Sequence, residues 1–135
     1  MQTSIMKGKI YVMGAASGDP NLLTDQALRV LRAAEVVLHD DLVSAAILDL
    51  IPASAQVRNI HKLSAPAGRL QETVHSLLVS AARQGHQVLR LKATGTVSSA
   101  RTDEEIEALG QAGIDYELVP ASASAVGAAA GTTSR

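Results

Sequence analysis

The sequence predicts an α/β domain, a three-layer sandwich with a five-stranded, mainly parallel sheet between two layers of helices. Short, nearly continuous apolar runs alternate five times with longer segments of helical periodicity. Such runs are typical of parallel strands, which are buried on both faces. The 135 residues suffice for one core, so we expect a single domain over residues 1–135, with a polar lead-in over residues 1–7.

The first half of the chain predicts three strands and two helices. Asp19 and Pro20 are expected to open the first helix, because they combine a capping side chain with a preset φ. Ser44 is expected to cap the second helix, which continues to Ile51 and stops before Pro52. The strands are expected at residues 10–13, 36–38 and 56–60, and the first helix at residues 24–34.

The second half predicts two further helices and two further strands. Apolar residues repeat at helical spacing over residues 70–84, and Gly85 ends that helix. Thr102, with Glu105 three residues later, forms a capping box that is expected to begin the last helix, which ends at Gly113. Strands are expected at residues 88–91 and 116–119. Residues 121–135 are rich in Ala, Ser and Gly and are expected to form a short helix or a frayed tail.

Composition argues against several classes of function. Net charge is −1, with 12 basic and 13 acidic residues and no run of like charge, so neither a nucleic-acid partner nor a membrane partner is expected. The absence of cysteine excludes disulfide and thiolate chemistry, and the four histidines show no metal-ligand spacing. Without a signal-peptide pattern at the N-terminus, a cytoplasmic protein is expected. Phe and Trp are also absent, so Val, Leu, Ile and Ala must form the core.

The carboxyl ends of the predicted strands are the candidate site, because ligands of parallel α/β sheets bind there. Gly14 and Gly18 lie in the loop after the first strand, but their spacing fits neither a P-loop nor the G-x-G-x-x-G pattern. Asp40 follows the second strand, where a dinucleotide-binding fold carries its ribose-binding carboxylate. A plain turn for the glycines and a solvated loop carboxylate for Asp40 are the open alternatives.

Several short blocks of sequence also occur in a fixed order. Residues 14–24 read G-A-A-S-G-D-P-N-L-L-T, residues 34–43 read A-E-V-V-L-H-D-D-L-V, and residues 87–92 read Q-V-L-R-L-K. Further blocks continue the register at residues 71–72, 104–105 and 116–120. As an ordered set, these blocks resemble the tetrapyrrole methylases, and most closely the uroporphyrinogen-III C-methyltransferases.

The resemblance implies a strand order of 3-2-4-1-5 and a cleft between this N-terminal domain and a second α/β domain. It also implies a homodimer that uses S-adenosylmethionine to methylate pyrrole carbons of uroporphyrinogen III, toward precorrin-2, sirohaem and cobalamin. The matching positions are Asp19 and Asp40 as catalytic candidates, Gly14, Gly18 and Pro120 for the cofactor, and Lys62 and Arg101 for the substrate.

The departures from the family pattern lie at the functional edge. The family's G-G-D reads A-T-G at residues 93–95, and the first loop has Ala16-Ser17 in place of G-P. The family's G-K-R reads H-K-L at residues 61–63, and its V-P-G-V-T-S reads V-P-A-S-A-S at residues 119–124. The family's second domain is expected to have no counterpart. Such changes would reduce an apolar patch left by a removed domain.

The departures favour an isolated N-terminal domain, engineered or reconstructed. Such a domain is expected to lack independent catalysis and strong cofactor binding, and a monomer is one oligomeric state that it could adopt. The rival hypothesis is a residual methyltransferase half that still binds S-adenosylmethionine or tetrapyrrole. A third hypothesis, a dinucleotide-binding domain, rests on the predicted fold and on Asp40 alone.

Overall fold

The computed structural model describes residues 8–14, 19–93 and 100–120, with only the main chain described over residues 100–105. Five strands form one sheet in which every neighbouring pair is parallel, in the order β3-β2-β4-β1-β5. This result confirms the predicted fold class and strand order. The strands are β1 (Lys9–Gly14), β2 (Val36–His39), β3 (Gln56–Asn59), β4 (Val88–Lys92) and β5 (Asp115–Pro120).

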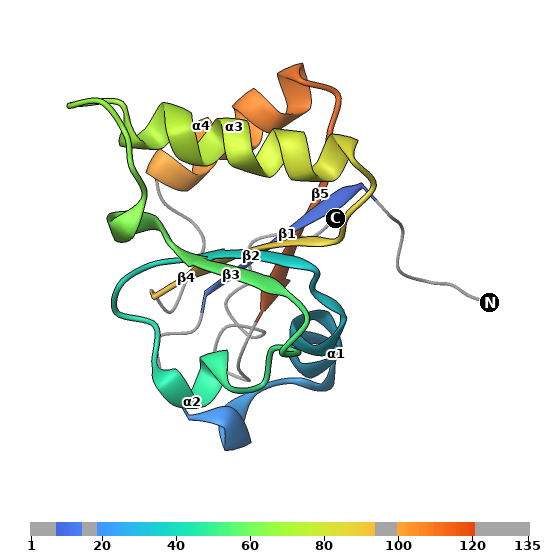
Figure 1. The fold of residues 1–135 in the computed structure, drawn as a ribbon. Coiled ribbons are helices and arrows are strands. Elements are labelled where there is room, and N and C mark those ends of the chain that lie inside the picture. The colour runs from blue at the N-terminus through green and yellow to red at the C-terminus, as the bar shows by residue number, and fades with distance from the viewer. Residues whose placement is uncertain (1–7, 15–18, 94–99, 121–135) are drawn as a thin grey trace.

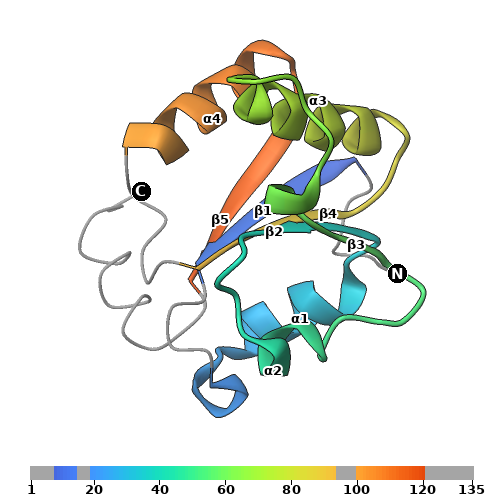
Figure 2. The ribbon, with the colours of Figure 1, turned by 60° about the vertical axis from the view of Figure 1, so that its left-hand side comes forward.

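Helices cover both faces of the sheet, as Figures 1 and 2 show. Right-handed crossovers explain the division, because β1 to β3 progress toward one edge of the sheet and β3 to β5 return toward the other. Two of the described α-helices therefore lie on each face. On one face they are α1 (Asp25–Ala33) and α2 (Ala45–Leu48), and on the other α3 (Leu70–Arg83) and α4 (Ala100–Gln111).

The core consists of two apolar clusters separated by the sheet. Alternate residues of each strand contribute to opposite clusters, so that Leu89 belongs to the cluster with α1 and α2, and Val88 to the cluster with α3. Tyr11 is the one aromatic side chain among the described residues of the core. The core is aliphatic, as the composition predicts.

The first two helices differ from the predictions at their ends. Asp19 and Pro20 open a separate 3-10 turn, η1 (Pro20–Leu22), whereas α1 begins at Asp25 with Thr24 as its cap. Helix α2 ends at Leu48, three residues before the predicted end. The amide of Ile51 donates to the carbonyl of Leu48 in a tighter turn. Proline disfavours helical geometry in the residue before it, so Pro52 explains why Ile51 does not continue the helix.

The last helix begins at Ala100, so Thr102 lies inside α4 and is not its cap as predicted. The predicted helix ends at Gly85 and Gly113 agree with the structure, because both residues adopt positive φ angles, of 91° and 75°. A second 3-10 turn, η2 (Ile60–Lys62), follows β3. The predictions for residues 1–7 and 121–135 concern segments outside the described residues. No helix in the described part of the chain is long and apolar enough to cross a membrane.

Candidate functional site

The carboxyl ends of the parallel strands meet at one edge of the sheet. Gly14, at the end of β1, pairs in register with Lys92 of β4 and with Pro120 of β5. In the order of the elements, β1 is followed by α1, which lies on one face of the sheet, and β4 is followed by α4, which lies on the other face. The adjacent ends of β1 and β4 are therefore a switch point of the sheet, where α/β domains bind their ligands.

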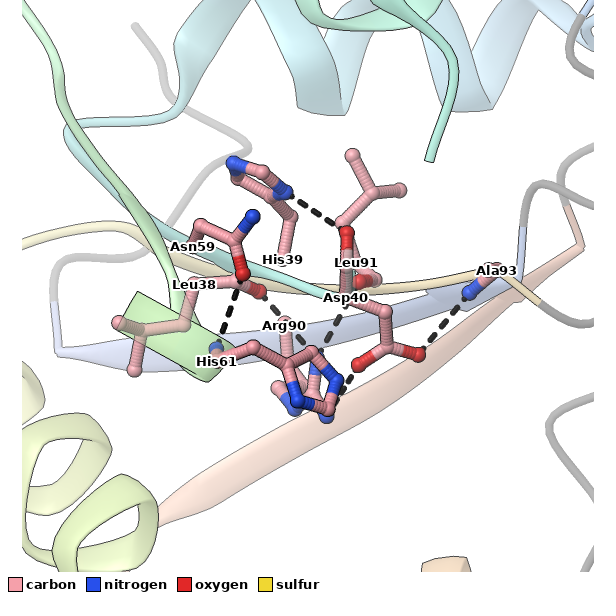
Figure 3. Close-up of polar contacts among 8 residues, drawn as sticks. All are labelled: Leu38, His39, Asp40, Asn59, His61, Arg90, Leu91 and Ala93. Atoms are coloured by element: carbon pink, nitrogen blue, oxygen red, sulfur yellow. Dashed lines mark hydrogen bonds and ion pairs between the residues drawn. The ribbon is translucent and has the colours of Figure 1, made fainter. Parts of the chain in front are cut away.

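Asp40 follows β2 at this edge and is bound on both of its carboxylate oxygens (Figure 3). The guanidinium of Arg90 donates from Nη2 to Asp40 Oδ1 over 2.8 Å. The main-chain amide of Ala93 donates to Asp40 Oδ2 over 3.1 Å. Asp40 thus connects the end of β2 to the end of β4. Its side chain remains 24% exposed.

Arg90 is a buried charge in the middle of β4, with a side chain only 4% exposed. Its Nη1 donates to the main-chain carbonyl of Leu38 over 3.4 Å and to that of Leu91 over 3.2 Å. Its Nε is buried and has no hydrogen-bond partner among the described residues. In the sequence, Arg90 is part of a strand block and is not among the predicted site residues. The signal for its role is a charge inside an apolar run, because a buried charge needs a partner.

The pKa of Asp40 reflects opposing effects. Partial burial is the largest and alone would raise the pKa, because it disfavours the charged form. The charge of Arg90, the hydrogen bonds from Arg90 and Ala93, and the charge of Lys92 together lower the pKa below its ordinary value. Asp40 is therefore ionised at neutral pH.

This lowered pKa predicts a loss of stability in acid. A carboxyl group with a folded-state pKa below its unfolded value, about 3.9, stabilises the fold above that value and ceases to do so as pH falls through the folded pKa. The stability advantage of the wild type over Asp40→Asn should therefore be constant above about pH 5 and shrink below about pH 4. Urea unfolding across this range measures it, with the exposed-residue variant Asp49→Asn as the control for losing one charge. A constant advantage down to pH 3 would contradict the linkage.

Two histidines and an asparagine extend the polar edge beyond Asp40. The Nδ1 of His39, a buried side chain, lies 2.9 Å from the carbonyl oxygen of Asp40. A carbonyl can only accept, so this bond requires a proton on Nδ1. The side-chain oxygen of Asn59 accepts from the amide of His61 over 2.9 Å (Figure 3). The Nδ2 of Asn59 donates to Asp41 Oδ1, also over 2.9 Å. These contacts join the end of β3 to the segment after β2.

The other predicted site residues occupy different positions. Gly14 and Pro120 lie together at the edge, where the Pro120 carbonyl accepts a 3.0 Å hydrogen bond from the hydroxyl of Thr24. Asp19 is exposed and accepts from the amide of Asn21, so it caps η1. Lys62 is an exposed residue at the end of η2. Gly18 and the side chain of Arg101 lie outside the described part of the structure.

Metal ligation has no geometric basis in residues 8–14, 19–93 and 106–120. Their His, Asp and Glu side chains include no group of three that could hold a metal ion. Asp40 is the one predicted site residue with a buried charge partner among these residues.

Comparison with known proteins gives consistent results. Residues 9–133 match the family model for the tetrapyrrole (corrin/porphyrin) methylases. Siroheme synthase of Hahella chejuensis is 42% identical over 123 residues, which are 91% of this chain and 26% of that protein. The chain therefore spans about a quarter of the length of this relative.

Solved structures show the same likeness. The uroporphyrin-III-C-methyltransferase of Thermus thermophilus superposes with a TM-score of 0.72 at 43% identity, over 92% of this chain and 52% of that one. A structure of the Thermus thermophilus enzyme complexed with S-adenosylhomocysteine superposes with a TM-score of 0.67 at 35% identity, over 86% and 46% of the two chains. On the family match, the sequence identity and the structural superposition, the chain belongs to the tetrapyrrole methylase family.

Proposed function

We propose that this chain is a tetrapyrrole methylase domain that does not transfer methyl groups on its own. It keeps the fold of its family and the Asp40 carboxylate at the carboxyl edge, which is the edge of the sheet where the parallel strands end. One observation carries the proposal: hydrogen-bonding groups at the carboxyl edge bind one another. The Ala93 amide donates to Asp40, and the Thr24 hydroxyl donates to the Pro120 carbonyl. Neither donor is therefore free to receive a ligand.

The residues that follow β4 also fit S-adenosylmethionine poorly. In the family pattern a G-G-D sequence follows β4, and here the sequence is A-T-G at residues 93–95. The change removes a carboxylate and adds a side chain at Ala93, whose amide already binds Asp40. We therefore expect weak or no binding of the cofactor to this chain.

Asp40 is the candidate that retains chemical capacity. Each carboxylate oxygen accepts one described bond from Arg90 or Ala93 and keeps room for another, since an ionised carboxylate has about four acceptor sites. Its lowered pKa keeps it anionic at neutral pH. It therefore suits a cation or an N–H donor, such as a pyrrole N–H group, in a site completed by a second domain. Asp19, engaged in capping η1, is the weaker catalytic candidate.

The pattern of substitutions supports an engineered or reconstructed origin. Directly after Pro120 and Ala121, the family's V-T reads Ser122-Ala123 in this sequence, so a polar serine replaces an apolar valine and an alanine replaces a larger threonine. The loss of the valine side chain would reduce exposed apolar area in a domain separated from its second half and so limit aggregation. This interpretation predicts that the purified chain is a monomer, and sedimentation equilibrium measures its oligomeric state directly.

Methyl transfer tests the proposed function. The purified chain is incubated with methyl-labelled S-adenosylmethionine and uroporphyrinogen III, alone and with the separately expressed remaining half of the Thermus thermophilus enzyme. The whole Thermus thermophilus enzyme is the positive control. We expect no transfer by the chain alone, and transfer by the chain alone would contradict the proposal.

The mixture decides between the scaffold domain and the rival residual half. Restored transfer in the mixture would favour a residual methyltransferase half, whose substrate contacts would include Lys62 and Arg101. No transfer, with a cooperatively folded chain, supports a domain without catalysis. The dinucleotide-binding alternative has a separate test, since it requires saturable NAD binding that Asp40→Asn weakens.

A further inference from the structure

Arg90 occupies a position in the sheet where an aliphatic residue would be expected. Its register partners are Leu38 of β2 and Val12 of β1, both of which belong to the apolar cluster with α3. Arginine is rarely buried at such positions unless it is paired. The Arg90 side chain is nevertheless buried.

Packing alone does not explain Arg90. Its Nε is buried without an acceptor among the described residues, and an unsatisfied buried donor costs free energy. A buried ion pair is in general no more stabilising than apolar residues of similar volume. An arginine at this position therefore calls for a reason other than the stability of the sheet.

The contacts of the guanidinium indicate that reason. Nη1 is held by the carbonyls of Leu38 and Leu91, and Nη2 donates to Asp40 Oδ1. The two carbonyls belong to neighbouring strands, so they fix the guanidinium relative to both. Arginine presents its donors in a rigid planar fork, which a lysine ammonium does not provide. With Ala93 binding Oδ2, the carboxylate of Asp40 is held from two directions (Figure 3).

We propose that Arg90 is a positioning residue, which holds the Asp40 carboxylate in one orientation at the carboxyl edge. Because the Ala93 amide binds the same carboxylate, this arrangement also connects the end of β4 to the end of β2. The carboxylate then presents its remaining acceptor sites on its solvent-exposed side. The positioning of Asp40 by Arg90 does not depend on the proposed function. Only one part of the inference rests on that function, namely that the fixed carboxylate serves a site completed by a second domain.

Nuclear magnetic resonance of the full chain tests the orientation directly. Three-bond couplings report the χ1 rotamer of Asp40, and hydrogen exchange reports the Ala93 amide. In the wild type we expect couplings of a single Asp40 rotamer and a protected Ala93 amide. Couplings averaged over several rotamers in the wild type would overturn the proposal without any variant.

Three variants separate positioning from charge and from general stability. Arg90→Met removes the charge, whereas Arg90→Lys keeps the charge and removes the fork. Lys9→Met removes a different interstrand ion pair, the 2.7 Å contact of Lys9 with Glu117. In both Arg90 variants we expect Asp40 couplings averaged over several rotamers and about tenfold faster hydrogen exchange at the Ala93 amide. A tenfold change corresponds to the net free energy of about one hydrogen bond. In Lys9→Met we expect no change at Asp40 or Ala93.

The contrary results are equally specific. A single Asp40 rotamer in Arg90→Lys would show that charge alone suffices and would overturn the positioning role, even if Arg90→Met fails to fold. Unchanged couplings in Arg90→Met would also overturn it. These readouts need no ligand, so failure of the proposed function in the methyl-transfer assay remains distinguishable from failure of this inference.

Discussion

Replacing Asp40 by alanine is expected to lower the free energy of unfolding by about 3 kcal/mol, the lower end of the range for breaking a buried ion pair. The reason is the charge that stays behind. Arg90, with a side chain only 4% exposed, would lose its one described carboxylate partner while its Nε already lacks an acceptor among the described residues. Urea unfolding at pH 7 measures the loss.

A double variant separates this cost from the loss of the Asp40 side chain itself. Adding Arg90→Met to Asp40→Ala removes the stranded charge, so the double variant should recover much of the lost stability. Lys9→Met is the control, because its ion pair with Glu117 is more exposed, with side chains 21% and 36% exposed, and should contribute about 1 kcal/mol or less. A double variant less stable than Asp40→Ala alone would contradict the argument.

Leu89→Ala is the core substitution with the largest expected effect, a loss of about 2–5 kcal/mol. Leu89 lies in the central region of the sheet with no exposed surface, between Tyr11 of β1 and Val37 of β2. Truncation removes buried methyl groups and leaves a cavity, which close-packed strands on both sides can fill only in part. Thermal and urea unfolding both report the change.

The matched control for this prediction is Leu42→Ala, in the exposed turn after β2. Leu42 is 85% exposed, so the same truncation there should change the free energy of unfolding by less than about 0.5 kcal/mol. Equal losses in the two variants would mean that Leu89 does not lie in the core. A small loss at Leu89 would contradict the close packing around β4.

The strands of the fold could be predicted from the sequence because burial on both faces leaves a simple pattern. Apolar runs mark β1, β2 and β4, which are buried along their length, apart from the partly buried first residue of β1. The strand order came from the resemblance, since parallel pairing joins residues far apart in the chain. Helix ends were less predictable. Thr102 carries a capping signal, yet α4 begins at Ala100, because a cap is a weak local preference that an adjoining helix former can override.

The candidate site was predictable in place but not in its contacts. The rule that ligands bind at the carboxyl ends of strands located Gly14, Asp40 and Pro120 correctly at one edge. The partner of Asp40 was not predictable, because Arg90 is fifty residues away and reaches Asp40 only through the pairing of β2 with β4. Periodicity assigns a residue to a strand, but a contact between strands depends on register.

Calorimetric titration with S-adenosylhomocysteine tests the central claim most directly, on a chain first shown to unfold cooperatively. The Thermus thermophilus enzyme is the positive control. We predict a cooperative transition and no saturable binding, because the described donors at the carboxyl edge bind Asp40 and Pro120. Saturable binding with a micromolar dissociation constant, about −8 kcal/mol, would contradict the claim and show that this domain retains a working cofactor site.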